Sequence, residues 1–470
     1  MQIETIVAFL IFISFAIFTI SQADGWGITR FPFVISGVFT AFLSAQILLF
    51  LLVDSQSLYY YVENDVIFVG EICILLCFLC ALGGYYLTLK RIDTDAENNT
   101  NDNNNQIPEY DNENIIQAYR SHLDVSSWII AIVSTFSYLW LVLIGGGLKQ
   151  FLLEGGNYEI TYEGLPVYLI FVVRFIYIAI AIQLFLWCKF KKINHLYLAL
   201  LFSLIPLSNI IFLFRRSEVL ILGVIFAHFM VRYGKIRLNR VTVISCLIAF
   251  LFVFRLFPEL RSYNFGEAPL AEIADKITKV DETDIDKSEI VGSFLRIDSV
   301  NRSGDFQYGA IFYNSIINQY VPSGIFGADF KNSLKIPLDE LEYNSVSLFY
   351  NYLSPLSFAQ VYQQFWYFGA LIFALLGAFM AWLERRMAHS PRDEIFYAVM
   401  LGILATALTA DLTVFVARGL AYYIVVALAV PRFWIGASPP LETSSAPLEM
   451  ITPALAPDRT QPSGASPTSR

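Results

Sequence analysis

The chain has little charge and few histidines or cysteines. Asp, Glu, Lys and Arg make up 15% of its 470 residues, whereas hydrophobic residues make up 56%. The mean hydropathy is +0.57, which excludes an ordinary soluble domain and is typical of a polytopic membrane protein. The net charge of −9 comes mostly from three loop regions, so it says little about binding partners.

Several sequence motifs are absent. There is no Gly-rich loop ending in Lys and Ser or Thr, which excludes a nucleotide-hydrolysing motor, and there is no basic soluble domain for nucleic acid. The five cysteines form no disulfide framework. Cys73, Cys77 and Cys80 share a helical face, but no His or acid stands at ligand spacing. These cysteines are therefore interpreted as small apolar residues that pack between helices and not as a metal site. We also expect no cofactor.

Apolar runs dominate the chain, and about eleven of them are long enough to cross about 30 Å of hydrocarbon. No charged segment precedes the first run and no small-residue cleavage site follows it, so we expect a retained helix and not a signal peptide. The predicted fold is therefore an all-α polytopic membrane protein with one large outer loop. The runs are roughly 4–22, 31–53, 66–89, 126–146, 165–187, 195–214, 217–232, 240–257, 358–382, 395–413 and 418–435.

Basic residues in the short loops predict the orientation. Lys and Arg gather in alternate connections, which the positive-inside rule assigns to the cytoplasm. We therefore expect the N-terminus outside and the C-terminus in the cytoplasm. The cytoplasmic set is Arg30, Lys90, Arg91, Arg120, Lys189, Lys191, Lys192, Arg232, Lys235, Arg237, Arg240, Arg385, Arg386 and Arg392.

Composition divides the chain into an integral membrane domain over 1–435 and a disordered tail over 436–470. The tail is rich in Pro, Ser and Ala. A second disordered segment is expected in the cytoplasmic loop 92–120, because its Asn/Asp-rich stretch is too polar to bury a core.

The outer loop, 258–357, is too long to be an idle connector. Its first half, Ala271–Glu289, is acidic and amphipathic, which predicts a helix near the membrane surface. Its second half, Asn301–Leu338, is rich in Tyr, Phe, Asn and Gly. That composition suits either a carbohydrate-binding groove or an aromatic belt at the membrane interface.

Charged side chains in or beside the apolar runs gather on the predicted outer face. Ionisable groups in a membrane span are costly, so they are functional candidates by default. A guanidinium matches phosphate oxygens and stays charged, so we expect a membrane-embedded pyrophosphate site. Alternatively, the arginines reach lipid headgroups or pair with acids. The outer set is Arg215, Arg216, Glu218, Arg255, Arg261, Asp411 and Arg418, with Gln360, Gln363 and Gln364 at the start of a later span.

Arg174 lies deeper, near the middle of its predicted span. We expect it either to contact substrate or to form a buried ion pair, with Glu71 as the candidate partner. The two interpretations stay open at this point.

Three stretches resemble the Wzy-type oligosaccharide repeat unit polymerases, the O-antigen or exopolysaccharide polymerases. The first is the turn Arg215-Arg216-Ser217-Glu218, which leads directly into an apolar helix. The second is Tyr308-Gly309 followed by Tyr320-Val321-Pro322-Ser323 and Phe326-Gly327. The third is Tyr362-Gln363-Gln364-Phe365-Trp366-Tyr367-Phe368-Gly369. The similarity of architecture covers about residues 1–435, and the motifs cover only 210–225 and 300–370.

The resemblance implies a membrane glycosyltransferase of the bacterial inner membrane. Its donor would be a growing chain on undecaprenyl pyrophosphate and its acceptor a single lipid-linked repeat unit. A chain-length regulator and a flippase of the same pathway would be partners, with no metal or nucleic acid. The implied catalytic residues are Arg215, Arg216, Glu218, Asp305 and Asp411. The implied substrate-binding residues are Arg255, Arg261, Arg418, Tyr308, Tyr320 and Gln364.

Two alternatives remain. The related O-antigen ligases share the architecture, and Arg216 with Leu220 fits their Arg-x-x-x-Leu pattern, but they usually carry an essential His in the outer loop, and 258–357 has none. A lipid-linked oligosaccharide flippase or another polysaccharide transporter would usually show internal repeats, and we see none between the halves.

Overall fold

The computed structural model describes residues 3–21, 25–44, 47, 64–100, 113–144, 147, 165–213, 215–236, 289–321, 323–337, 356–387, 390–409 and 412–430. These residues are helical or lie in short turns, and no strand occurs among them. All of them belong to one compact unit, Met1–Ile435. The predicted disordered tail over 436–470 and the predicted span over 240–257 lie outside the described residues.

The described part of the chain contains the following helices, in chain order. They are α1 (Ile3–Ser21), η1 (Gly25–Thr29), α2 (Phe31–Val38), η2 (Phe39–Ser44), α4 (Asn64–Thr100), α5 (Glu113–Ile144), α8 (Leu165–Val173), α9 (Ile176–Phe190), α10 (Ile193–Phe202), α11 (Leu204–Leu213), α12 (Arg216–Arg232), α16 (Glu289–Ser303), α17 (Ala310–Tyr320), α18 (Ser323–Phe326), α19 (Ala328–Ser333), α21 (Ser357–Phe365), η4 (Trp366–Gly369), α22 (Ala370–Met387), α23 (Pro391–Leu408) and α24 (Leu412–Ala429).

Five helical stretches in the described part of the chain are long and apolar enough to cross a membrane. A sixth is added if the pair α10 and α11, bent by 42°, counts as one span. The chain is therefore an all-helical, polytopic membrane protein, as its hydropathy predicts. The five stretches are Glu4–Ser21, Asp65–Ile92, Tyr119–Ile144, Tyr168–Phe190 and Ser357–Met387.

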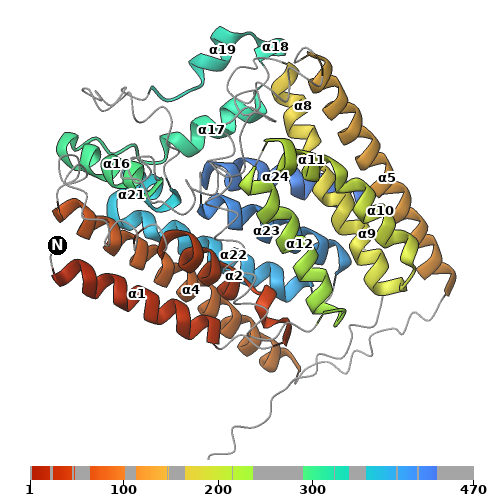
Figure 1. Ribbon diagram of the computed structural model, residues 1–470, viewed down its shortest axis with the longest axis horizontal. Coiled ribbons are helices and arrows are strands. Elements are labelled where there is room, and N and C mark those ends of the chain that lie inside the picture. The colour runs from red at the N-terminus through yellow and green to blue at the C-terminus, as the bar shows by residue number, and fades with distance from the viewer. Residues whose placement is uncertain are drawn as a thin grey trace, which may run out of the picture. The chain divides into compact units, whose positions relative to one another are not determined.

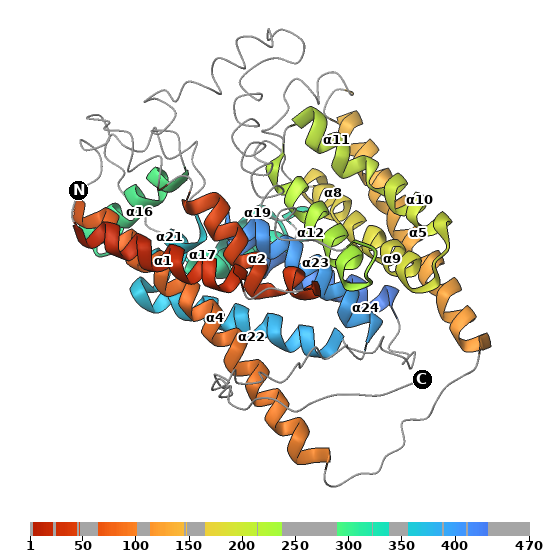
Figure 2. The same cartoon turned by 60° about the horizontal axis from the view of Figure 1, so that its bottom comes forward.

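Two groups of helices flank a central pair (Figures 1 and 2). Helices α5, α8, α9 and α10 pack together on one side, and α1, α4 and α22 pack together on the other. Between them, α12 packs against α23, and both also contact α9. Helix α9 is buried on all sides over most of its length, with every side chain from Ile176 to Leu186 buried. An apolar helix that is buried all round is typical of the centre of a membrane bundle.

Helices α4 and α22 pack so closely that glycine is required on both. A Cβ atom built on Gly84 would lie 2.0 Å from the carbonyl oxygen of Ala374, and one built on Gly377 would lie 2.0 Å from that of Ala81. Helices in a membrane associate through van der Waals packing, and small residues let their backbones approach. These two glycines therefore fix the contact between the longest helix and the span that follows the outer loop.

Ion pairs join the helices at the end of the bundle that carries the predicted cytoplasmic residues. Arg30 pairs with Glu384 at 2.7 Å, and Arg232 pairs with Glu394 at 2.9 Å. A third pair joins Arg386 on α22 to an acid in the first turn of α23 at 3.0 Å. The basic residues that the positive-inside rule selects therefore hold several helices together, in addition to any role in orientation.

The helices beside the predicted loops are longer than hydropathy indicates. Helix α4 continues to Thr100 and α5 begins at Glu113, so both extend into the segment 92–120 that the sequence predicts to be disordered. In the outer loop, α16 begins at Glu289, where the predicted amphipathic helix ends. The rest of that predicted helix lies outside the described residues.

Candidate functional site

The site begins at the break between α11 and α12. Helix α11 ends at Leu213, Arg215 is extended with φ −83° and ψ 105°, and α12 begins at Arg216. The N–H of Arg215 donates to the carbonyl oxygen of Asn209 at 3.3 Å, which ties the turn back to α11. The first N–H groups of a helix lack partners within it, and they carry the positive end of its dipole. Two arginines at this point add to a field that favours an anion.

Arg216 contacts the predicted outer loop directly. Its guanidinium forms an ion pair with the carboxylate of Glu289, the first residue of α16. The same guanidinium lies 5.9 Å from the centre of the Phe42 ring, a distance at which a cation is attracted to the face of an aromatic ring. The two side chains of the ion pair are 23% and 19% exposed, so solvent reaches this pair and a ligand can compete for Arg216.

Helix α16 connects Arg216 to the second and third motifs. Its apolar face packs on α4 and α21, with Phe294 and Ile297 fully buried. At its far end, the side-chain oxygen of Asn301 accepts a hydrogen bond of 2.7 Å from the hydroxyl of Tyr362. One helix of the predicted outer loop therefore reaches from the arginine turn to the segment Tyr362–Gly369.

The second and third motifs lie in contact. The N–H of Tyr308 donates to the backbone oxygen of Gln364 at 2.9 Å, and the N–H of Gly309 donates to the Gln364 side-chain oxygen at 2.9 Å. The side-chain amide nitrogen of Gln364 donates to Gln307 at 2.9 Å. The side-chain amide of Gln364 thus forms hydrogen bonds with residues at the start of α17, which is a structural role. Its predicted role in substrate binding stays a prediction.

Backbone geometry explains why the third motif ends in glycine. Trp366, the first residue of η4 and the one that follows α21, has φ +54°, a conformation that is rare outside glycine and stores strain. Three residues later, a Cβ on Gly369 would lie 2.1 Å from the carbonyl oxygen of Val361. The turn is therefore tight enough to need Gly369, and it exposes Trp366, whose side chain is 48% accessible.

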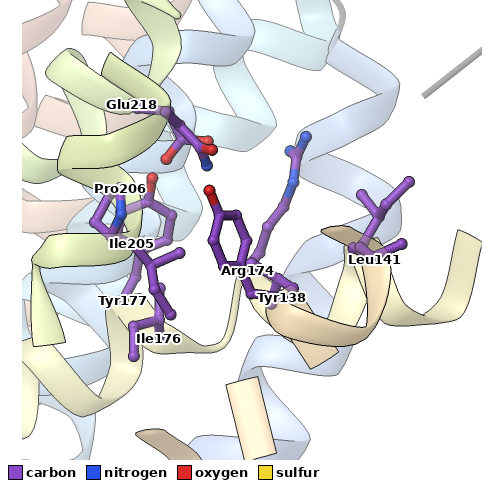
Figure 3. A pocket seen from close by; sticks show the side chains of 11 residues that line it. Tyr138, Leu141, Arg174, Ile176, Tyr177, Ile205, Pro206 and Glu218 are labelled. Carbon is purple, nitrogen blue, oxygen red and sulfur yellow. The ribbon is translucent and has the colours of Figure 1, made fainter. Parts of the chain in front are cut away.

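A small cavity with a few polar groups in its lining lies under the arginine turn (Figure 3). Side chains from four different parts of the chain line it, and Glu218 and Arg174 reach towards the same space from α12 and from the turn between α8 and α9. Its volume is about 20 Å³, which suits a water molecule and excludes a sugar ring. The lining residues are Tyr138, Leu141, Ile170, Val173, Arg174, Ile176, Tyr177, Ile205, Pro206, Asn209 and Glu218.

Of the two interpretations of Arg174, the ion pair with Glu71 is wrong, and contact with substrate stays a prediction. Both carboxylate oxygens of Glu71 are buried without a hydrogen-bond partner in the described part of the chain, while Arg174 lines the cavity with Glu218. Glu71 lies on α4 and Arg174 lies between α8 and α9, helices that belong to opposite flanks of the bundle. Hydropathy cannot show this separation.

The remaining predicted residues are dispersed. Asp305 is exposed in the turn after α16, and Tyr308 is 76% exposed. Tyr320 ends α17, and burial raises the pKa of its phenol. Arg418 is half-buried on α24, the helix against which α17 packs. Arg255, Arg261 and Asp411 lie outside the described residues, so their predicted roles stay predictions.

Two more glutamines of α21, Gln360 before the third motif and Gln363 within it, differ from each other. The side-chain oxygen of Gln360 accepts a hydrogen bond of 2.9 Å from the N–H of Leu412, at the start of α24. Gln363 is fully buried, and neither atom of its side-chain amide has a partner among the residues that the structure describes. Helix α21 therefore carries one glutamine that caps α24 and, within the motif, one whose amide has no partner among the described residues.

Sequence reasoning missed Glu289, Tyr177 and Asn209. Glu289 belongs to an acidic segment that drew attention only as an amphipathic helix. Asn209 is a single amide in an otherwise apolar run, six residues before Arg215, and this was the available signal. Tyr177 carries no such signal, because tyrosine is common in membrane helices.

No group of three or more His, Cys, Asp or Glu side chains in the described residues stands close enough to hold a metal ion.

Comparison of the chain with protein-family models, with curated proteins and with solved structures finds no match. The resemblance to repeat unit polymerases therefore depends on the three motifs and on their arrangement in space.

Proposed function

We propose that the chain is a membrane glycosyltransferase that polymerises undecaprenyl-pyrophosphate-linked oligosaccharide repeat units at the outer face of the bacterial inner membrane. The observation that carries the proposal is the arginine turn at the start of α12, which contacts the outer-loop helix α16 through Arg216 and Glu289. Through α16, the turn is linked to the two other motifs of the resemblance.

The chemistry suits a pyrophosphate leaving group. In the proposed reaction, an acceptor hydroxyl attacks the anomeric carbon of the donor chain, and the bond to the lipid pyrophosphate breaks. Arg215 and Arg216, with the N-terminus of α12, stabilise the charge that develops on the departing pyrophosphate. Glu218, in the first turn of the same helix, takes the acceptor proton. Arginine supplies fixed positive charge here without a metal.

The proposal includes eleven spans with an outer N-terminus. The predicted orientation is supported by three arginines, Arg30, Arg232 and Arg386, which form ion pairs at the same end of the bundle. Single cysteines test the orientation with a membrane-impermeant thiol reagent in whole cells. A cysteine at the exposed Asn332 of α19 should react, and one at the exposed Lys191 should react only after lysis. The reverse pattern would refute the orientation.

The activity is tested with Arg216→Ala in cells. Polymer should be lost while single repeat units still reach the surface, because export precedes the proposed step. Arg302→Ala is the matched control, since Arg302 is exposed and pairs with Asp298 within its own helix; it should keep the polymer. A purified-protein assay with lipid-linked repeat units and no nucleotide sugar completes the test, and absence of chain extension by the wild type would refute an enzyme.

The second candidate is a transporter of lipid-linked oligosaccharides. Glu71 favours it, because this side chain is 3% exposed in a membrane helix and its carboxylate has no partner among the described residues. Buried acids in spans often mark ion or proton pathways. Accumulation of lipid-linked units in the inner leaflet of the Arg216→Ala or Glu71→Gln strains would support the transporter instead.

A further inference from the structure

The cavity under the arginine turn contains unsatisfied polar groups. The hydroxyl of Tyr177 and the side-chain oxygen of Asn209 both belong to residues that line it. Within the described part of the chain, neither atom has a hydrogen-bond partner. The two residues are only 1% and 5% exposed, so bulk water does not replace the missing bonds. A buried hydroxyl or carbonyl in this condition is unfavourable unless something binds to it.

Size and charge define what binds. The cavity volume of about 20 Å³ exceeds the 10–15 Å³ or so that one water molecule needs, and it is far too small for a sugar or a phosphate. Arg174 and Glu218 also line it and have opposite charges, so an ion of either sign gains little there. Tyr177, Asn209 and Glu218 offer the two to four polar partners that a buried water typically has.

The cavity is coupled to the arginine turn at two points. Asn209 presents its side chain to the cavity and its backbone oxygen to the N–H of Arg215. Glu218 lines the cavity from the first turn of α12, two residues after Arg216. Whatever binds between Asn209 and Glu218 therefore affects the position of the carboxylate that stands beside the two arginines.

We propose that this cavity binds one water molecule, held by the Tyr177 hydroxyl and the Asn209 side-chain oxygen, and that this water positions the carboxylate of Glu218. The role for Glu218 rests on the proposed glycosyl transfer; the water site itself does not. Tyr177 and Asn209 are then positioning residues, which act on the reaction only through Glu218.

The variants are Tyr177→Phe, Asn209→Leu and their combination. Replacing both unsatisfied partners with apolar groups of similar shape is close to neutral for stability, so the double variant should unfold at the wild-type temperature or above it. Tyr119→Phe is the matched control, because it also removes a buried hydroxyl without a partner in the described residues, and Tyr119 does not line the cavity.

Chain extension by purified protein gives the kinetic result. The double variant should lose about 10- to 100-fold in kcat, as expected when a catalytic group is misplaced by about 1 Å, with KM within about twofold of wild type. Tyr119→Phe should retain wild-type kcat. Wild-type kcat in the double variant would overturn the proposal. So would a loss of kcat that merely follows a lower unfolding temperature.

An experimental structure of the wild type and the double variant gives a second result that does not depend on activity. The wild type should show one density peak within hydrogen-bond distance of Tyr177 and Asn209, and the double variant should lose the peak and shift the Glu218 side chain. A wild type without the peak, or an unmoved Glu218, would overturn the proposal. If the wild type shows the peak and the double variant shows the shift of Glu218, but the wild type extends no chain, the water site stands and the proposed glycosyl transfer is refuted.

Discussion

Adjacent glycines on α4 should respond in opposite directions to the same substitution. Gly83 and Gly84 both lie inside this helix. A Cβ on Gly84 would lie 2.0 Å from the backbone oxygen of Ala374, whereas a Cβ on Gly83 meets nothing within 4 Å. Backbone atoms cannot rotate away as the end of a side chain can, so Gly84→Ala must push α4 and α22 apart.

The magnitude follows from that distance. To restore an ordinary contact, the two helices must separate by about 1.4 Å at their closest point, which loses dispersion contacts over several turns. Overpacking of this kind typically costs about 1–3 kcal/mol. Gly83→Ala has no such clash and should gain up to about 1 kcal/mol from the higher helix propensity of alanine. The two variants should therefore differ by about 1–4 kcal/mol in the free energy of unfolding.

Unfolding in mixed micelles measures this difference. Purified variants are titrated with SDS and followed by the fluorescence of the tryptophans, and the midpoint should fall for Gly84→Ala and stay or rise for Gly83→Ala. Gly377→Ala provides the reciprocal case, because its Cβ would lie 2.0 Å from the backbone oxygen of Ala81. Equal midpoints for Gly83→Ala and Gly84→Ala would refute the close packing of α4 and α22.

The remaining predictions concern ion pairs. Glu289→Gln removes the carboxylate that pairs with Arg216. In the chain-extension assay, KM for the lipid-pyrophosphate substrate should fall about threefold or more, because the pyrophosphate no longer competes with a carboxylate for the arginine. A higher KM would refute this competition. Glu394→Gln leaves Arg232 buried beside a neutral amide and should cost about 3–5 kcal/mol of stability, measured by the same SDS titration. Asp298→Asn, which removes the partner of an arginine that is 60% exposed, should cost less than about 1 kcal/mol in that titration and leave KM unchanged. Equal losses in Glu394→Gln and Asp298→Asn would refute the role of burial.

Hydropathy predicts the long membrane helices because length and apolarity are local properties. The runs at 4–22 and 66–89 lie within or beside α1 and α4, and the polar break at Arg215 is where α12 begins. Hydropathy does not predict that the run 165–187 contains a turn at Arg174 or that the next run bends at Ser203. Kinks inside apolar runs depend on packing against neighbours, which a running average over the sequence cannot include.

Pairings across the chain were predicted less well. The arginine turn was located by sequence, but its ion pair joins residues 73 positions apart, and the partner Glu289 lies in a loop whose composition indicated only amphipathicity. Asn209 was visible as a lone amide in an apolar run, yet its relation to Tyr177 depends on how α9 and α11 pack. Local pattern therefore identified the charged groups, and tertiary packing determines which of them meet.

The position of α16 bears on how the outer loop contributes to the proposed reaction. A loop that merely covered the membrane surface would expose both faces of its helices, whereas α16 buries Ile290, Phe294 and Ile297 completely. A Cβ on Gly70 of α4 would lie 2.3 Å from the ring of Phe294, so the membrane helix itself is shaped to receive this loop helix. The loop is consequently held in a fixed place relative to α4, and the carboxylate of Glu289 is held beside Arg216. In the proposed reaction, a substrate pyrophosphate would compete for Arg216 with a carboxylate fixed by core packing, so anion binding there would be selective for groups with more charge than one carboxylate.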